Sequence, residues 1–212
     1  MSLEKDILNN INGFAKKNIC IVGGMPKSFY SDISGYLNTN DSVYIFDTIK
    51  NIQDADNVIN SNRYDKVKIL RFPTSNKRFD WYGWHVLQYY HQLKLLNTDY
   101  QLFTALFYRG KHLIQYDMGT LPLAMKMIMP GGFLTVYDCS WSLAESPTMK
   151  PDVNTETNLQ YTKEQINIQQ VQYLLDTFID DDFIERKNLS SIKTRVYCKK
   201  QSSISGRDNS YY

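Results

Sequence analysis

The chain has 212 residues, 42% of them hydrophobic and 22% charged, and its 24 basic and 22 acidic residues leave a formal net charge of +2. This length and apolar content predict one globular domain, and the near balance of charge makes nucleic acid the less favoured partner. The N-terminus lacks the apolar stretch of a signal peptide, and no apolar run approaches the roughly 20 residues of a membrane span. We therefore expect a cytoplasmic protein that does not act at a membrane.

The N-terminal third alternates between helical and strand patterns. Apolar spacing predicts helices over 3–17, 28–37 and 52–62, and short β-branched runs predict strands over 18–22, 42–47 and 67–72. Gly23-Gly24 stop the first strand directly, and the second strand ends in Asp47.

The region 76–110 is dense in aromatic residues. Trp84, Leu87, His91 and Leu95 share one helix face, and Leu102 to Leu106 suggest another short helix. Such helices could face both a sheet and a substrate pocket, or they could form the interface of a homodimer.

The remaining chain returns to alternation. A strand is predicted over 112–117 and again ends in an acid, a helix over 120–129 is stopped by Pro130-Gly131-Gly132, and a strand over 133–138 ends in Asp138. The long segment 139–161 is interpreted as a loop, and loops of this length are often lids. Thr162 and Gln165 form a capping box for a helix that carries an apolar stripe to Phe178. Two closing strands follow over 183–187 and 194–199, which completes one domain over 1–200 before a polar, disordered tail over 201–212.

Strands that alternate with helices predict an α/β fold with a mostly parallel sheet. Ligands of such sheets bind beyond the carboxyl ends of the strands. Asp47, Asp117 and Asp138 all stand at predicted strand ends, so we expect them at one edge of the sheet.

Gly23, Gly24 and Asp47 together point to an adenosine-containing ligand. Glycine after the first strand lets the backbone approach a ligand closely, and a carboxylate after the second strand can accept both hydroxyls of a ribose. The alternative interpretation is structural, because tight turns after a strand also use glycine.

These residues resemble the class I S-adenosylmethionine-dependent methyltransferases, over roughly 18–200. The resemblance is carried by Ile19 to Gly24, Asp47, Met129-Pro130-Gly131-Gly132-Phe133-Leu134 and the closing strand that ends in Thr194-Arg195-Val196-Tyr197. It implies a three-layer Rossmann-like sandwich whose seven-stranded sheet is mostly parallel with its last strand antiparallel. It also implies S-adenosylmethionine as cofactor.

The glycine-rich loop departs from the family pattern. Ile21 stands where the family commonly has an acid, Met25 stands in place of the second glycine, and Lys27 follows close behind. A lysine near a helix start could favour a phosphate, which would suit a nucleotide or nucleotide-sugar binder. A catalytically inactive binding or scaffold subunit is the further alternative.

The resemblance also implies roles for individual residues. For the cofactor it implies Gly23, Gly24, Met25, Asp47, Phe72 and Asp117, and for the substrate Trp81, Trp141 and Asp138. Asp117 is the candidate base for a hydroxyl acceptor. Asp117 and Asp138 also match the carboxylates of the metal-dependent O-methyltransferases, where a Mg²⁺ would lower the pKa of the substrate hydroxyl; capping of the next helix is the alternative role of such acids.

The acceptor is expected to be a hydroxyl on a small molecule or a sugar. An RNA (cap-type) methyltransferase is the remaining alternative. It requires a Lys-Asp-Lys-Glu set, of which Asp117 could supply the aspartate, whereas the second lysine would fall at Tyr137 and the glutamate near Arg195.

Overall fold

The computed structural model describes residues 2–61 and 67–201, and it forms an α/β sandwich around one seven-stranded sheet. The predicted tail 201–212 lies outside the described residues apart from Gln201. The strands are β1 Asn18–Val22, β2 Ser42–Thr48, β3 Lys68–Thr74, β4 Phe103–Tyr108, β5 Ile128–Tyr137, β6 Phe183–Glu185 and β7 Thr194–Lys199. The helices are α1 Leu3–Asn10, α2 Lys27–Ser34, α3 Ile49–Ser61, α4 Tyr82–Leu95, α5 Ile114–Lys126, α6 Thr157–Gln160, α7 Lys163–Asn167 and α8 Gln170–Phe178, with a 3₁₀ turn η1 at Leu143–Glu145.

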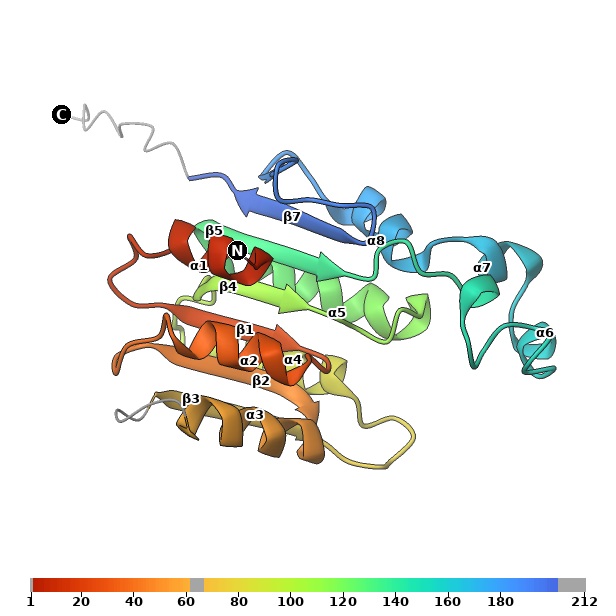
Figure 1. Ribbon diagram of the computed structural model, residues 1–212, viewed down its shortest axis with the longest axis horizontal. Helices are drawn as coiled ribbons and strands as arrows, with labels where there is room; N and C mark the ends of the chain where they lie inside the picture. Colours follow the sequence, from red (N-terminus) through yellow and green to blue (C-terminus); the bar gives the residue numbers. More distant parts are fainter. Residues whose placement is uncertain (1, 62–66, 202–212) are drawn as a thin grey trace.

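The sheet has the strand order β3-β2-β1-β4-β5-β7-β6 (Figure 1). The first five of these strands are parallel, and β7 runs antiparallel to both β5 and β6. This confirms the fold expected from the sequence, including the antiparallel last strand. The carboxyl ends of the parallel strands all lie at one edge of the sheet, on the side of the segment that carries α6 and α7 (Figure 1).

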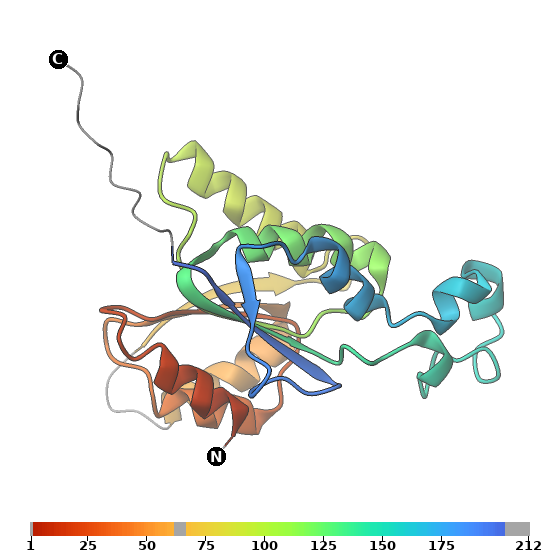
Figure 2. The same cartoon turned by 90° about the horizontal axis from the view of Figure 1, so that it is seen from above.

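Helices cover both faces of the sheet. The first three helices lie on one face, and α4, α5 and α8 lie on the other (Figure 2). Each layer closes its own hydrophobic core, one built around Ile19, Ile45 and Phe107, the other around Val22, Leu106 and Val136. Alternate residues of β1 and β4 therefore point into opposite cores, which is why these central strands are apolar throughout.

Two predicted elements around the fourth strand are wrong. The expected short helix near Leu102 to Leu106 is β4, every residue of which is buried between β1 and β5. The expected strand over 112–117 instead leads into α5, whose first turn contains Asp117. A short run of apolar residues fits a buried helix as well as a buried strand, so periodicity alone could not separate them.

Two boundaries also differ from the sequence prediction. Pro130-Gly131-Gly132 lie inside β5, where the pairing with β4 shifts register between Phe103 and Ala105, and Gly131 has a φ of 79°. The capping box of Thr162 and Gln165 is present, but it begins the short α7, and the apolar stripe belongs to the separate α8. None of the described helices is long and apolar enough to cross a membrane.

Candidate functional site

A cavity of about 580 Å³ lies at the carboxyl ends of four parallel strands. The loops after β1, β2, β3 and β4 line it, with the residues Gly23, Gly24, Asp47, Thr48, Asn51, Thr74, Ser75, Asn76, Lys77, Arg78, Asp80, Trp81, Tyr82, Arg109, Gly110, Lys111, Leu113 and Tyr116. The volume falls in the range of small-molecule sites, and the position is where open parallel sheets bind ligands. Gly23, Gly24, Asp47 and Trp81 thus share one cavity.

The glycine turn after β1 packs directly on the loop after β4. Gly23 has a φ of 86°, and a Cβ at this position would collide with the carbonyl oxygen of Arg109. Gly24 lies beside the Asp47 carboxylate, and a Cβ there would come within 2.9 Å of the Asn51 amide nitrogen. Both glycines are therefore needed for the close approach of β1, β2 and β4 at this edge.

Asp47 presents a nearly buried carboxylate to the cavity, with 5% of the residue exposed. Its Oδ1 accepts a hydrogen bond from the Thr48 backbone N–H at 2.7 Å, and its Oδ2 accepts one from the Asn51 side chain at 3.0 Å. Burial raises the pKa of this carboxyl, and the hydrogen bonds oppose that effect. Each carboxylate oxygen can accept a second hydrogen bond, so Asp47 retains the capacity to bind ligand hydroxyls.

Asp117 lies under the loop after β4 and does not reach the cavity. It is fully buried, and its Oδ1 accepts hydrogen bonds from the hydroxyls of Tyr82 at 3.0 Å and Tyr108 at 2.7 Å and from the Lys111 backbone N–H at 3.2 Å. Burial raises the pKa of this carboxyl. The sequence analysis expected it at the end of a strand, and its actual position on α5 leaves no surface for a substrate or cofactor.

A second polar cluster stands where β4 and β5 end. Asp138 Oδ2 lies 2.8 Å from Arg109 Nε and 3.3 Å from His112 Nε2. The His112 imidazole and then the Arg109 guanidinium lower the pKa of Asp138 to about 2. The Trp141 ring packs on the His112 ring with centroids 5.5 Å apart.

The backbone of this cluster is strained. His112 and Asp138 have φ values of 62° and 57°, a left-handed conformation that is uncommon for residues other than glycine. Such outliers persist only where surrounding structure holds them in place, and they concentrate at functional sites. The strain therefore points to this cluster as part of a working site.

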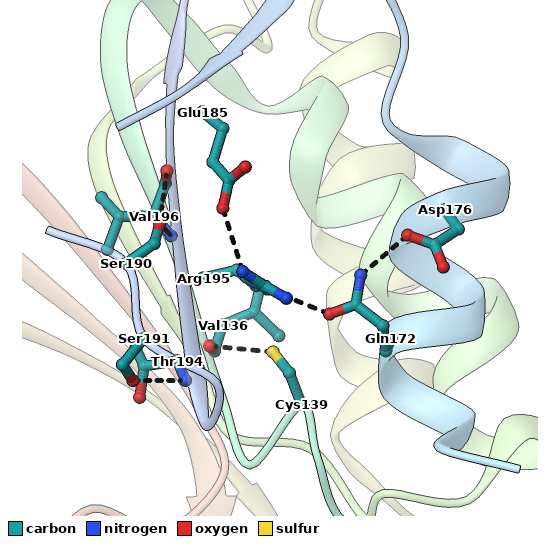
Figure 3. A network of polar contacts seen from close by, with 10 residues as sticks. All are labelled: Val136, Cys139, Gln172, Asp176, Glu185, Ser190, Ser191, Thr194, Arg195 and Val196. Carbon is teal, nitrogen blue, oxygen red and sulfur yellow. Dashed lines mark hydrogen bonds and ion pairs between the residues drawn. The ribbon is translucent and has the colours of Figure 1, made fainter. Parts of the chain in front are cut away.

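A network of polar contacts surrounds Cys139, the residue after Asp138, and the neighbouring strand β7 (Figure 3). The Cys139 N–H donates to the carbonyl of Lys193 at 2.9 Å, and the Cys139 thiol donates to the carbonyl of Val136 at 3.3 Å. On the neighbouring strand Arg195 Nε donates to Gln172 at 3.1 Å, and Arg195 also pairs with Glu185 (Figure 3). Burial raises the pKa of Cys139 to about 12, so this thiol is a structural group and not a nucleophile.

Sequence reasoning missed Arg109 and His112. His112 was expected to begin a strand at the edge away from the pocket, whereas it stands in the segment between β4 and α5, between the cavity residues Lys111 and Leu113, and does not itself line the cavity. Recognition of the run Phe103–Tyr108 as the strand would have placed both residues in a loop at a carboxyl end.

Three other expected site residues have different surroundings. Met25 is buried in the core with Phe29 and does not line the cavity. Phe72 stacks on Phe46 at 4.2 Å between ring centroids and is likewise absent from the cavity wall. Trp141 packs on His112, outside the cavity lining.

The expected magnesium pair is not supported by the structure. The hydroxyls of Tyr82 and Tyr108 bind Asp117, and Arg109 and His112 occupy the Asp138 carboxylate. Among residues 2–61 and 67–201 no group of three or more His, Cys, Asp and Glu side chains could hold a metal ion. The residues present therefore do not fit Mg²⁺.

The fold is similar to that of solved methyltransferase structures. No family model matches the chain, and no curated protein matches it in sequence. An O-methyltransferase from Bacillus cereus, solved in complex with SAH, is similar with a TM-score of 0.52 and 12% identity over 94% of this chain and 79% of that one. The O-methyltransferase TomG from Streptomyces achromogenes, solved with SAM, gives 0.53 and 10% over 94% and 78%, and a Corynebacterium glutamicum protein gives 0.56 and 10% over 93% and 79%.

These identities are low enough that the likeness concerns the fold and not the substrate. Three observations indicate the same fold. They are the strand order with its antiparallel β7, the cavity at the carboxyl edge of the sheet, and the similarity to solved methyltransferases. The chain has the class I fold of S-adenosylmethionine-dependent methyltransferases.

Proposed function

We propose that the protein is an S-adenosylmethionine-dependent O-methyltransferase that acts on the hydroxyl of a small molecule or sugar. One observation carries the proposal: the glycine turn after β1 and Asp47 share a cavity with Arg109. Arg109 in turn forms an ion pair with Asp138, which also lies beside His112, and both of these residues have a positive φ. An adenosyl ligand and a proton acceptor would then lie at neighbouring strand ends.

The residues of the cavity fit the cofactor. Asp47 would accept hydrogen bonds from the ribose hydroxyls, and the missing side chain of Gly24 leaves that carboxylate uncovered. The Arg109 guanidinium, with Nη1 3.4 Å from the Gly24 carbonyl oxygen, would pair with the carboxylate of the methionine part. When bound, S-adenosylmethionine supplies a methyl group already activated by its sulfonium, so the protein contributes mainly alignment.

His112 would act as the base for the acceptor hydroxyl. Its Nε2 lies 3.3 Å from Asp138 Oδ2, within ion-pair distance but without a hydrogen bond, and Nδ1 is the other ring nitrogen. The proton of the acceptor hydroxyl would pass to Nδ1, and Asp138 would orient the ring and stabilise the resulting imidazolium. His112 replaces Asp117 in this role because the Asp117 carboxyl is fully buried. Trp141, whose ring packs on His112 outside the cavity lining, would hold that imidazole in place.

Calorimetric titration with S-adenosylhomocysteine tests the cofactor assignment. We expect saturable binding to the wild-type protein and at least about tenfold weaker binding to Asp47→Asn, because an amide cannot replace both accepting oxygens. Unchanged affinity in Asp47→Asn would remove the ribose assignment. No heat at millimolar ligand would reject the methyltransferase and leave a binding or scaffold protein.

Methyl transfer to a panel of hydroxyl compounds, followed by mass spectrometry, tests the base. We expect His112→Gln to lower kcat by about 10²-fold or more, which is the usual contribution of a general base, and to change KM little. His91→Gln, at an exposed position of α4, is the matched control. Equal activity of the two variants would refute the role of His112.

A further inference from the structure

The walls of the cavity carry more positive than negative charge. Lys77 and Arg78 follow β3, and Arg109 and Lys111 follow β4, whereas Asp47 and Asp80 are the two acids of the lining. A cleft lined by one sign of charge focuses the electrostatic potential and concentrates ions of the opposite sign. The excess of positive over negative side chains therefore favours a ligand with negative charge.

Both acids already have partners. Asp80 accepts a hydrogen bond from the Ser75 backbone N–H at 2.8 Å and lies 2.6 Å from His85 Nε2. Asp47 accepts its bonds from Thr48 and Asn51. Among the described residues neither acid forms a salt bridge with a lysine or arginine of the cavity wall, so the two acids offset only part of the positive charge of its four cations.

Three of the four cations have no ion-pair partner within the described residues. Arg109 is paired with Asp138. Lys77 and Lys111 form no salt bridge there, and the guanidinium of Arg78 contacts only the Phe79 ring, 5.3 Å from its centroid. Lys111 is close enough to Asp47 to counter part of the rise that burial causes in the pKa of that carboxyl.

S-adenosylmethionine does not account for this excess. It carries a single carboxylate, for which Arg109 suffices, together with a sulfonium and an ammonium that further cations would repel. Lys77, Arg78 and Lys111 therefore match a second ligand in the same cavity. Lys111 directly precedes His112, so an anion bound there would lie on the loop that carries the proposed base.

We propose that the methyl acceptor is an anionic metabolite, a hydroxyl compound bearing a phosphate or diphosphate that Lys77, Arg78 and Lys111 bind. This inference rests on the proposed function, since it assigns the class of acceptor for the same site. The anion would anchor the acceptor beside the adenosyl group and bring its hydroxyl toward His112, which lowers the entropic cost of alignment.

Inorganic pyrophosphate is the probe. It is titrated by calorimetry into protein saturated with S-adenosylhomocysteine, at two ionic strengths. We expect binding that weakens as salt rises, and a loss of affinity of about tenfold or more in Lys77→Gln/Arg78→Gln and in Lys111→Gln, which remove charge-assisted bonds. Lys16→Gln/Lys126→Gln, which removes two exposed lysines just before β1 and β5 at the opposite edge, is the charge-matched control and should bind as the wild type does.

The outcomes separate this inference from the function on which it rests. Binding of S-adenosylhomocysteine without any binding of pyrophosphate, or an equal loss in the cavity and control variants, would overturn the anionic acceptor and leave the methyltransferase standing. Displacement of S-adenosylhomocysteine by pyrophosphate would also overturn it, because the anion would then occupy the place of the cofactor. Binding of pyrophosphate to a protein that ignores S-adenosylhomocysteine would reject the methyltransferase and support the anion site alone.

Discussion

Asp117 illustrates how a single buried residue can organise a site without contacting its ligand. The hydroxyls of Tyr82 and Tyr108 and the backbone N–H of Lys111 all donate to its Oδ1, and Gly110 lies so close that a Cβ there would collide with the carboxylate. The loop that presents Arg109 and Lys111 to the cavity is thus tied to the first turn of α5. The carboxyl is a structural anchor of the cavity wall.

We expect Asp117→Leu to lower the free energy of unfolding by about 2–4 kcal/mol, because it leaves buried donors without an acceptor. Asp117→Asn should cost much less, since an amide oxygen can still accept from the two tyrosines. Urea denaturation followed by fluorescence measures both. Equal losses in the two variants would show that the accepting oxygen is not what stabilises the loop.

Burial raises the pKa of Asp117, and this makes the stability of the wild type depend on pH in a way that the stability of Asp117→Asn does not. An acid whose folded pKa exceeds its unfolded value of about 3.9 binds its proton more tightly when folded, so its contribution to stability falls as pH rises from that value through the folded pKa. In parallel denaturation series the wild type should therefore lose stability relative to Asp117→Asn as pH rises above about 4. A constant difference would contradict an ionisable Asp117.

Site residues could be predicted from the sequence where a residue of suitable chemistry follows a strand that the sequence marks clearly. Glycines after the first strand and an acid after the second brought Gly23, Gly24 and Asp47 to one cavity, because each was tied to a strand end that the sequence marks clearly. Arg109 was not identified and His112 was assigned to the start of a strand, because the true strand before them, Phe103–Tyr108, was interpreted as a helix. Their charges carry no periodic signal of their own, so only the fold could reveal them.

At the scale of elements, the turn after β1 depends on glycine for geometry. The Gly23 N–H donates to the Phe46 carbonyl at 3.0 Å, and the Arg109 N–H donates to the Val22 carbonyl at 2.8 Å, which locks β1 between its neighbours. With a φ of 86° and no room for a Cβ, Gly23 holds the turn against the β4 loop. Gly23 therefore fixes how β1 packs against the loop after β4 at the carboxyl edge of the sheet.

Gly23→Ala should lower the free energy of unfolding by more than the roughly 1–2 kcal/mol that left-handed backbone costs an L-residue, because the collision with Arg109 adds to it. Gly119→Ala is the matched control: nothing lies within 4 Å of the added Cβ, and its place inside α5 predicts a gain of about 0.5–1 kcal/mol. Thermal and urea denaturation of the two variants should shift in opposite directions. A neutral Gly23→Ala would mean that the turn can rearrange.

Helices and strands could be predicted from the sequence where a residue such as glycine or proline marks their ends. β1 ends just before Gly23, β2 ends one residue after Asp47 and β3 one residue after Pro73, and all three strands lie close to their predicted positions. β4 has no such boundary at its start, and its six buried residues fit either type of element. Pro130-Gly131-Gly132 suggested a turn, but the register shift of β5 absorbs these residues within the strand.

At the scale of the whole molecule, the two edges of the sheet are built differently. The carboxyl edge carries the open cavity with its unpaired cations. At the opposite edge Lys17, which precedes β1, and Asp41, which precedes β2, form a buried ion pair at 3.4 Å, with 5% and 2% of their side chains exposed. Asp41 also accepts hydrogen bonds from the backbone N–H groups of Lys17 at 2.8 Å and Asn38 at 2.7 Å. The Lys17–Asp41 pair therefore stabilises the fold at a distance from the cavity, which lies at the carboxyl edge.

This division predicts that stability and binding can be changed separately. Asp41→Ala should lower the free energy of unfolding by about 3–5 kcal/mol, because it strands the buried Lys17 ammonium and two backbone donors. Lys17→Met should cost less, since Asp41 keeps both backbone hydrogen bonds. Neither variant, measured by calorimetry while still folded, should change the affinity for S-adenosylhomocysteine by more than about twofold, because distant sites without shared partners act independently. A loss of affinity in proportion to the loss of stability would mean that the two edges are coupled through the sheet. The geometry of the cavity would then depend on contacts at the opposite edge as well as on those at the carboxyl edge.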